Sequence, residues 1–374
     1  MGKAEAIVVG AGVAGLAVAR ALAIKGYNVK VIEKDHNAVG ASIRNFGMVW
    51  PIGQPAGELY ETAKRSAAIW KDICGAAGLF CDPVGSFHLA YHQDEAKVLE
   101  ELYEIYHEER PLKLLKPDEV IQRSGAVVPE GLCLGLYSGD EVIVDPRQAI
   151  RGIPAFFQEK YGIEFIWNKA VTGVAEGSVL TCDQIFNADL VIVCTGANFE
   201  TLLPEIAADH RSTKCKLQMM RVVAQPEGWR IGPALCGGLS LIHYNSFKAA
   251  TSLQQLRERY ENEMPEYLKW GIHVMVSQNG GGELTIGDSH EYGGTHDPFD
   301  KQFINELILK YLDGFARFRN GQILESWNGV YTKLTDGSPY FFTESKPGVF
   351  VFNGLGGAGM TLSFGLAEKL VMSI

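Results

Sequence analysis

One stretch near the start of the chain, residues 6–23, reads AIVVGAGVAGLAVARALA. It predicts a buried strand, a glycine-rich turn and a helix, because an apolar run precedes the turn and small apolar residues follow it. Residues 28–33 read NVKVIE and predict the next parallel strand, which ends on the acid Glu33. Glycines spaced Gly-x-Gly-x-x-Gly between a strand and a helix are typical of a dinucleotide-binding site.

Each residue of this pattern has a physical role. Gly10 allows the tight turn out of the strand, Gly12 lets the backbone approach a pyrophosphate, and Gly15 lets the helix pack on the sheet. The N-terminus of the helix directs free amides at the phosphates. Glu33 follows at the distance where a carboxylate accepts hydrogen bonds from ribose hydroxyl groups. The pattern therefore predicts a dinucleotide cofactor.

The composition limits the other classes of function. The 374 residues are 47% hydrophobic and 21% charged, which suffices for a large core and favours two interwoven domains. A net charge of −10 and the lack of a Lys/Arg cluster argue against a nucleic-acid partner. The seven cysteines are scattered and never in Cys-x-x-Cys spacing. They predict neither a disulfide framework nor a zinc site, and they fit a reducing compartment.

The distribution of apolar residues predicts no membrane span. The chain has no apolar run of the roughly eighteen residues that a membrane helix needs. Glycines interrupt the apolar N-terminal run, which also lacks the basic segment and the cleavage site of a signal peptide. We therefore expect a cytoplasmic protein.

The remaining chain predicts alternating helices and strands. Helical spacing predicts a helix over residues 58–77, and Asp145-Pro146 predicts the cap and first turn of a helix that runs to about residue 160. The apolar run 188–194 predicts a buried parallel strand that meets a ligand at Thr195-Gly196. The other expected elements are strands at 216–224, 237–242, 272–286 and 322–331, helices at 252–270 and 303–318, and a C-terminal strand, glycine turn and helix at 349–370.

The glycine pattern, Thr195-Gly196 and the turn at 354–359 resemble the flavoprotein family of D-amino-acid oxidase, glycine oxidase and sarcosine oxidase, over essentially the whole chain. The most specific segment is 327–339, WNGVYTKLTDGSP, which is similar to the family's Trp-x-Gly-x-Arg-Pro…Asp-Gly-x-Pro segment without a gap. The resemblance implies an α/β fold with a Rossmann-like FAD-binding domain of the glutathione-reductase type and a second, mixed, largely antiparallel substrate sheet. It implies an FAD-binding domain of residues 1–78, 140–212 and 322–374 and a substrate domain of residues 79–139 and 213–321.

This resemblance also implies how FAD is held. The amides of Gly356–Met360 would face the electron-rich edge of the flavin, where a helix N-terminus stabilises negative charge. No cysteine occurs in that segment, so we expect noncovalent FAD. The residues expected to contact it are Gly10, Gly12, Val13, Ala14, Gly15, Glu33, Lys34, Ser42, Arg44, Asn45, Gly47, Met48, Val174, Thr195, Gly196, Trp327, Gly356, Gly357, Ala358, Gly359, Met360 and Thr361.

One position departs from the family pattern. Tyr331 stands where the amino-acid oxidases carry an arginine that grips the substrate carboxylate, and Thr332 replaces the proline that follows. A phenol cannot supply a permanently charged, bidentate clamp. Another cation must then hold an acidic substrate. Arg221 and Arg44 are the candidates, with a surface salt bridge as the alternative role of each.

Three further segments, 216–221, 237–244 and 287–292, are similar to a branch of the family associated with the breakdown of aminophosphonates. The substrates of that branch are chiefly 2-aminoethylphosphonate and its N-methylated relatives. The resemblance implies oxidation of a small primary or secondary amine with an acidic group, by hydride transfer to flavin N5 and hydrolysis of the imine to an aldehyde or keto product. Oxygen is the expected electron acceptor, and another acceptor stays open.

Such chemistry can proceed by positioning alone, so no catalytic residue is assigned. His243 and Tyr244 are expected to end one strand and His290 to follow another, and all three would line the substrate cavity with Tyr331. Met48 would pack near the flavin. The alternatives are structural roles: a hydrogen-bonded histidine, a core tyrosine or a core methionine. The spacing of the histidines predicts no metal site.

Two other functions stay open. An FAD-dependent 2-hydroxy-acid dehydrogenase would need a base beside the alcohol, for which His290 or His243 is available. A flavin-binding subunit without turnover of its own would explain the missing arginine. The sequence does not predict the oligomeric state.

Overall fold

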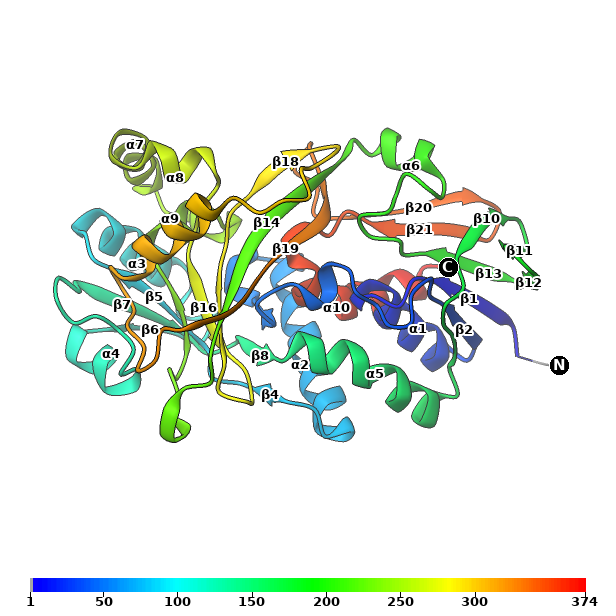
Figure 1. The fold of residues 1–374 in the computed structure, drawn as a ribbon, viewed down its shortest axis with the longest axis horizontal. Helices are drawn as coiled ribbons and strands as arrows, with labels where there is room; N and C mark the ends of the chain where they lie inside the picture. Colours follow the sequence, from blue (N-terminus) through cyan, green and yellow to red (C-terminus); the bar gives the residue numbers. More distant parts are fainter. Residues whose placement is uncertain (1–2) are drawn as a thin grey trace.

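The glycine motif lies at the centre of a sheet. β1 (Glu5–Val9) runs between parallel neighbours in a six-stranded sheet of order β20-β21-β13-β1-β2-β9, which we call the parallel sheet. The edge strand β20 is antiparallel to β21. The computed structural model describes residues 3–374, and Figure 1 shows this sheet on the right. Its other strands are β2 (Asn28–Ile32), β9 (Glu164–Ile166), β13 (Leu190–Val193), β20 (Phe341–Lys346) and β21 (Val349–Asn353).

Both faces of the parallel sheet are covered. Side chains alternate along β1, so Ala6 and Val8 pack against the helices while Ile7 and Val9 join the core on the opposite face. This double burial explains the nearly continuous apolar sequence of β1 and β13. The helices are α1 (Val13–Lys25), α2 (Glu58–Ala77), α5 (Pro146–Tyr161) and α10 (Gly359–Met372). The opposite face carries an antiparallel sheet of β10 (Val171–Ala175), β11 (Ser178–Thr181) and β12 (Ile185–Asn187).

A second, nine-stranded sheet, which we call the large sheet, fills the left half of Figure 1. Its order is β18-β14-β17-β16-β15-β5-β7-β6, with β19 paired to β14. β14 (Ser212–Val222) and β19 (Ile323–Leu334) pair from Ser212 opposite Leu334 to Val222 opposite Ile323 and lie between the two halves. The others are β5 (Ser86–Ala90), β6 (Leu112–Leu115), β7 (Leu134–Ser138), β15 (Ala234–Cys236), β16 (Met275–Gln278), β17 (Leu284–Gly287) and β18 (Glu291–Gly293).

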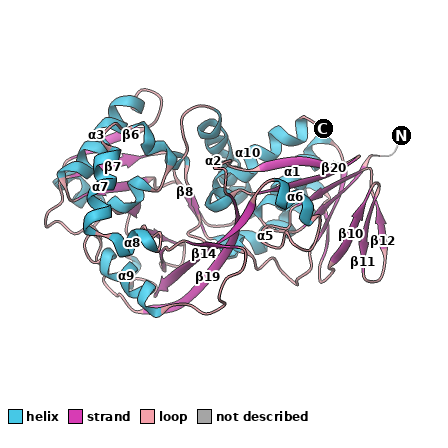
Figure 2. Cartoon of the chain, turned by 90° about the horizontal axis from the view of Figure 1, so that it is seen from above, coloured by secondary structure: helices cyan, strands magenta, loops and turns pink. Residues whose placement is uncertain are grey.

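Helices cover the outer side of the large sheet, as Figure 2 shows for α3, α7, α8 and α9. A small antiparallel sheet joins β8 (Val142–Val144) to β3 (Met48–Val49) and β4 (Cys81–Asp82). The remaining helices are α3 (Gln93–Tyr106), α4 (Pro117–Arg123), α6 (Pro204–Asp209), α7 (Leu253–Glu263), α8 (Pro265–Lys269) and α9 (Gln302–Leu312). The short 3-10 helices are η1 (Ala41–Ile43), η2 (Pro51–Gly53), η3 (Pro226–Gly228), η4 (Gly238–Ile242), η5 (Asn245–Ala249) and η6 (Gly356–Ala358).

The predicted α/β class with a largely antiparallel second sheet is confirmed, and so are several elements. α2 spans the predicted residues 58–77, and the Asp145 carboxylate caps α5 by accepting from the amides of Arg147 and Gln148. The expected strand at 272–286 is two antiparallel strands, β16 and β17. The division of the chain into two discontinuous domains remains a prediction.

The strand predicted at 237–242 is wrong. These residues form the 3-10 helix η4, and the preceding strand β15 ends at Cys236. The cause is Ser240, whose amide and hydroxyl both donate to the carbonyl of Gly237, at 3.0 and 2.6 Å. A serine that binds nearby backbone in this way competes with strand pairing. His243 and Tyr244 therefore follow a helical turn rather than ending a strand.

Within residues 3–374, no helix combines the length and apolarity that crossing a membrane requires. All seven cysteines are free thiols.

Candidate functional site

A cavity of about 730 Å³ opens where the carboxyl ends of four strands meet. Val9, Ile32, Cys194 and Asn353, which stand at the ends of β1, β2, β13 and β21, all line it. The volume lies in the range of sites for small molecules and cofactors. Of the residues predicted to hold a cofactor, the cavity is lined by Gly10, Gly12, Val13, Ala14, Glu33, Lys34, Ser42, Arg44, Thr195, Gly196, Gly356 and Gly359.

The first glycine turn forms one wall of the cavity. Gly10 has φ +103°, and a Cβ there would lie 2.5 Å from the Cys194 carbonyl oxygen. A Cβ on Gly15 would lie 1.9 Å from the Gly10 carbonyl oxygen, so Gly15 serves helix packing and does not face the cavity. Gly12 is the N-cap of α1 and supplies no side-chain cap. Ser42 Oγ accepts from the Val13 amide at 2.9 Å, and the other amides of the first turn of α1 stay open toward an anion.

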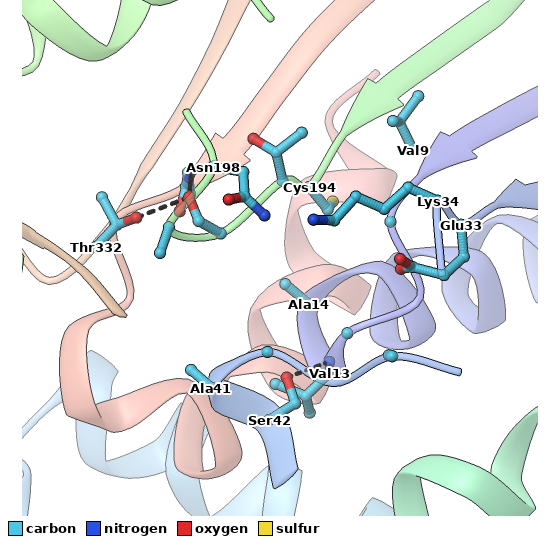
Figure 3. Close-up of a pocket in the computed structure, with 18 of the residues that line it drawn as sticks. Val9, Val13, Ala14, Glu33, Lys34, Ala41, Ser42, Cys194, Asn198 and Thr332 are labelled. Atoms are coloured by element: carbon cyan, nitrogen blue, oxygen red, sulfur yellow. Dashed lines mark hydrogen bonds between the residues drawn. The ribbon is translucent and has the colours of Figure 1, made fainter. Parts of the chain in front are cut away.

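Glu33 marks the ribose end predicted from the sequence. Its Oε2 accepts from the Ala11 amide at 2.8 Å and its Oε1 from the Asp35 amide at 3.2 Å. The carboxylate is thereby held at the end of β2 and retains lone pairs for hydroxyl groups. Figure 3 shows Glu33 and Lys34 together at one end of the cavity and Ser42 below the turn.

Arg44 supplies a positive charge to the other end. Its Nε donates to the Val39 carbonyl at 2.9 Å and its Nη1 to the Asn328 carbonyl at 3.1 Å. No carboxylate in residues 3–374 forms an ion pair with it. The charge of Arg44 is therefore available to an anionic ligand.

The C-terminal glycine turn approaches Tyr331. A Cβ on Gly357 would lie 3.6 Å from the Tyr331 hydroxyl oxygen, and Tyr331 itself lines the cavity. The nearby carbonyl of Gly196 accepts from Thr332 Oγ1 at 2.8 Å and from Asn353 Nδ2 at 2.9 Å. These bonds tie β19, β21 and the end of β13 together around the cavity (Figure 3).

Several predicted cofactor residues do not line the cavity. Met48, Val174 and Met360 lie in hydrophobic cores, because strand or helix alternation turns their side chains inward. The side-chain amide of Asn45 donates to the carbonyls of Ala41 and Ser42 and so holds the conformation of the loop. The others that do not line it are Gly15, Gly47, Trp327, Gly357, Ala358 and Thr361. Lys169, Ala170, Val171 and Thr172 line it instead, and no motif in the sequence distinguishes them.

Beside Tyr331, the large sheet brings together three histidines, His243, His273 and His290, which we call the histidine cluster. One ring nitrogen of each lies within 4.8 Å of one ring nitrogen of each of the others. The His290 ring centroid is 6.5 Å from that of Tyr331, and the His243 centroid is 5.0 Å from that of Tyr244. The four predicted substrate residues His243, Tyr244, His290 and Tyr331 thus lie in one neighbourhood, but of these four only Tyr331 lines the cavity.

Sequence reasoning missed His273 and Asp288, which complete this neighbourhood. His273 and Asp288 exchange both backbone hydrogen bonds, at 3.2 and 2.9 Å, and His273 Nε2 lies 3.2 Å from Asp288 Oδ1. Such a pair on adjacent antiparallel strands points its side chains to the same face. The alternation of residues 272–276 (IHVMV) is the only signal that could have singled out His273.

Burial keeps His273 and His290 neutral at pH 7. It lowers the pKa of His290 to about 4 and the pKa of His273 well below the usual range for histidine. The positive charge of Lys333 lowers both pKa values further. Burial also raises the pKa of the Asp288 carboxyl well above its usual value.

The structure places Arg221 away from the cavity. Its Nη1 pairs with Glu283 Oε2 at 3.1 Å, and its guanidinium lies 5.8 Å from the Trp327 ring centroid. The prediction that Arg221 holds a substrate anion is therefore corrected to a buried salt bridge. Lys333 lies on β19 two residues beyond Tyr331, and its Nζ donates to the Tyr292 hydroxyl at 3.1 Å. It forms no ion pair with a carboxylate in the described residues.

Known structures with the same fold include several oxidases. Glycine oxidase from Geobacillus kaustophilus is similar with a TM-score of 0.77 and 19% identity, over 100% of this chain and 94% of that one. Iminodiacetate oxidase from Chelativorans sp. BNC1 is similar with a TM-score of 0.73 and 18% identity, over 98% of this chain and 95% of that one. L-alpha-glycerophosphate oxidase from Mycoplasma pneumoniae was solved with FAD bound. It is similar with a TM-score of 0.74 and 16% identity, over 100% of this chain and 96% of that one. No curated protein sequence matches the chain.

The sequence model of the DAO family, described as FAD dependent oxidoreductase, matches residues 5–372. The cavity fits FAD, because its glycine turn would not accommodate a Cβ at Gly10 and Glu33 stands at the predicted ribose end. Glu33 and the α1 N-terminus would hold the adenosine and pyrophosphate parts, and Tyr331 with Gly356 would lie toward the flavin. The chain belongs to the DAO family and is an FAD-dependent oxidoreductase.

Proposed function

We propose that this enzyme oxidises a small primary or secondary amine that carries a phosphonate group, such as 2-aminoethylphosphonate or its N-methyl form. The observation that carries the proposal is the neighbourhood of Tyr331. A tyrosine replaces the arginine expected there, and the cation nearby is Lys333, without a carboxylate partner among the described residues. A point charge with hydroxyl donors suits a tetrahedral dianion better than a planar carboxylate, which an arginine fork would match.

The proposal assigns separate binding roles to Tyr331 and Arg44, which line the cavity, and to Lys333, which lies two residues beyond Tyr331 on β19. Burial raises the pKa of Tyr331 well above its usual value, so its hydroxyl stays a hydrogen-bond donor at neutral pH. Lys333 supplies the charge that neutralises the acid group, while Arg44 remains for the anionic parts of the cofactor. When bound, FAD supplies a two-electron acceptor for the hydrogen on the carbon that bears nitrogen.

The overall reaction needs water and an electron acceptor. A primary amine R–CH2–NH2, with oxygen and water, gives the aldehyde R–CHO, ammonia and hydrogen peroxide. The protein's part is to hold the amine close to the flavin and to exclude bulk water until the carbon has been oxidised. This agrees with the named activity of iminodiacetate oxidase, which also takes a small amine with acidic groups.

The test is the visible absorbance of the FAD-loaded protein under anaerobic conditions. 2-Aminoethylphosphonate, its N-methyl form, glycine, sarcosine and lactate are added in turn. Selective bleaching by the aminophosphonates supports the proposal. Bleaching by glycine or sarcosine alone contradicts the phosphonate preference, and bleaching by no amine contradicts amine oxidation.

A hydroxy-acid dehydrogenase is the second candidate. The similarity to L-alpha-glycerophosphate oxidase, whose name implies oxidation of an alcohol that bears phosphate, keeps it open. Lactate and glycerol 3-phosphate in the same experiment separate the two functions. A protein that binds FAD and bleaches with no substrate would favour a flavin-binding subunit.

A further inference from the structure

The histidine cluster has the donor arrangement of a metal site. His290 Nδ1 lies 2.9 Å from the Gly271 carbonyl oxygen, so this nitrogen carries the hydrogen and donates it. The lone pair is then on Nε2. Metal-binding histidines are commonly fixed in this way, by a carbonyl or carboxylate that accepts from the other ring nitrogen.

His273 lies beside a carboxylate. Its Nε2 is 3.2 Å from Asp288 Oδ1 without forming an aligned hydrogen bond, and its Nδ1 is buried and has no hydrogen-bond partner among the described residues. A buried ring nitrogen without a partner is costly unless something binds it. His243 is exposed, whereas His273 and His290 are buried. The His243 ring packs on that of His273, with the centroids 3.8 Å apart, while the residue keeps access to solvent.

The spacing allows closure around one ion. Zinc lies about 2.0–2.1 Å from histidine nitrogens, so tetrahedral ligands are roughly 3.4 Å apart. The ring nitrogens of the cluster are within 4.8 Å of one another. Rotation of the exposed His243 side chain, which follows the short helix η4, is the adjustment that closure requires.

We propose that His243, His273 and His290 bind one divalent transition-metal ion, with the Asp288 carboxyl group beside the His273 ring. Three imidazoles suit zinc, nickel, copper or iron, and one coordination position stays open. Tyr331 lies 6.5 Å from His290, between ring centroids, so the open position is close to the proposed phosphonate site. The idea that the ion anchors the phosphonate group rests on the proposed function. The idea that the histidine cluster binds a metal ion does not.

The test measures zinc binding by the FAD-loaded protein without any substrate. After chelator treatment, calorimetric titration with zinc is expected to give one site per chain, and X-ray absorption at the zinc edge is expected to show imidazole ligands. His273→Gln and His290→Gln should each weaken zinc binding at least tenfold. His210→Gln, which changes a histidine bonded to Thr343 outside the cluster, should leave it unchanged.

The outcomes separate the two claims. No zinc site in a folded wild-type protein, or equal binding by the cluster variants and His210→Gln, overturns the metal site whatever the substrate is. Circular dichroism of each variant shows whether it is folded. Should a cluster variant unfold, the X-ray absorption spectrum of wild type decides alone. If zinc binds but its removal leaves the KM for the aminophosphonate unchanged, the result contradicts the anchoring role and supports the metal site.

Discussion

The hydroxyl oxygen of Ser42 accepts a hydrogen bond from the Val13 amide at 2.9 Å. This bond joins the first turn of α1 to the loop after β2, and it leaves the Ser42 hydroxyl hydrogen free to donate to a phosphate oxygen. Ser42→Ala should therefore weaken FAD binding by about 10-fold or more, since a hydrogen bond to a charged group contributes roughly 1.5–3 kcal/mol. Flavin fluorescence during titration of the apoprotein measures the Kd.

The control for Ser42 is Ser345→Ala, because the Ser345 hydroxyl donates to the Val349 carbonyl and lies away from the cavity. Equal FAD affinity of the two variants would contradict a role for Ser42 in cofactor binding.

Two glycine substitutions should have opposite effects. A Cβ on Gly15 would lie 1.9 Å from the Gly10 carbonyl oxygen, whereas a Cβ on Gly75 of α2 would meet nothing within 4 Å. Gly15→Ala must push α1 from the sheet, so the expected results are lower stability and loss of FAD. Gly75→Ala should be neutral or stabilise by about 0.5–1 kcal/mol, because glycine is unfavourable inside a helix. Chemical denaturation measures the stability of each variant, and the FAD content after purification measures its cofactor binding. A Gly15→Ala protein with wild-type stability and FAD content would refute the packing argument.

Tyr331→Phe removes a single hydroxyl from the proposed substrate site. If that hydroxyl donates to the phosphonate, kcat/KM for 2-aminoethylphosphonate should fall about 10- to 100-fold. The flavin absorbance spectrum and FAD content should stay as in wild type. Tyr103→Phe, at a half-buried tyrosine that is stacked on His107 and does not line the cavity, is the matched control. An unchanged kcat/KM would remove Tyr331 from the substrate site.

Lys333→Met tests the charge at the same site. The proposed role predicts a KM for the aminophosphonate at least 10-fold higher, while the turnover of a neutral amine is affected less. Lys269→Met, at an exposed lysine of α8, serves as the control. Steady-state kinetics with both substrates at two ionic strengths would show whether the effect is electrostatic. A loss of the same size for both substrates would argue against an anion-binding role.

The buried carboxyl of Glu141 predicts a pH dependence of stability. Its Oε1 accepts from the Ile52 amide at 2.9 Å, and burial raises its pKa from 4.5 to about 7. The folded state therefore favours the protonated form. The stabilisation that the protonated Glu141 contributes to the free energy of unfolding is fully present below pH 4.5 and is lost as the pH rises to 7. The loss is about 3 kcal/mol, since one pKa unit corresponds to about 1.4 kcal/mol.

Glu141→Gln imitates the protonated form and should flatten this part of the pH profile. Urea unfolding between pH 5 and 8 compares wild type, Glu141→Gln and the exposed-site control Glu104→Gln. Parallel profiles for wild type and Glu141→Gln would refute the prediction.

Local sequence patterns predicted much of the frame. The β1–α1 motif, the helix at 58–77 and the Asp145 cap depend on residues close together in the chain, so periodicity and capping chemistry could identify them. The same holds for Glu33, which lines the cavity as expected. The family resemblance predicted Ser42, Gly356 and Gly359, which line it too.

The substrate side depends on contacts between distant segments. His243 reaches the cluster through η4, a turn set by the Ser240 hydroxyl, and His273 reaches it through pairing with Asp288. The prediction for Arg221 failed for a similar reason. Its partner Glu283 comes from another strand, and an isolated arginine in a sequence does not reveal whether a carboxylate neutralises it.

The cavity is lined by residues from Val9, near the start of the chain, to Gly359, near its end. During synthesis the first glycine turn emerges long before the strand and turn that close the other side of the cavity. The cofactor can meet its whole set of contacts only when the turn that contains Gly359 has left the ribosome. Flavin uptake should therefore require synthesis through this turn, and chains cut short before residue 349 should emerge without FAD.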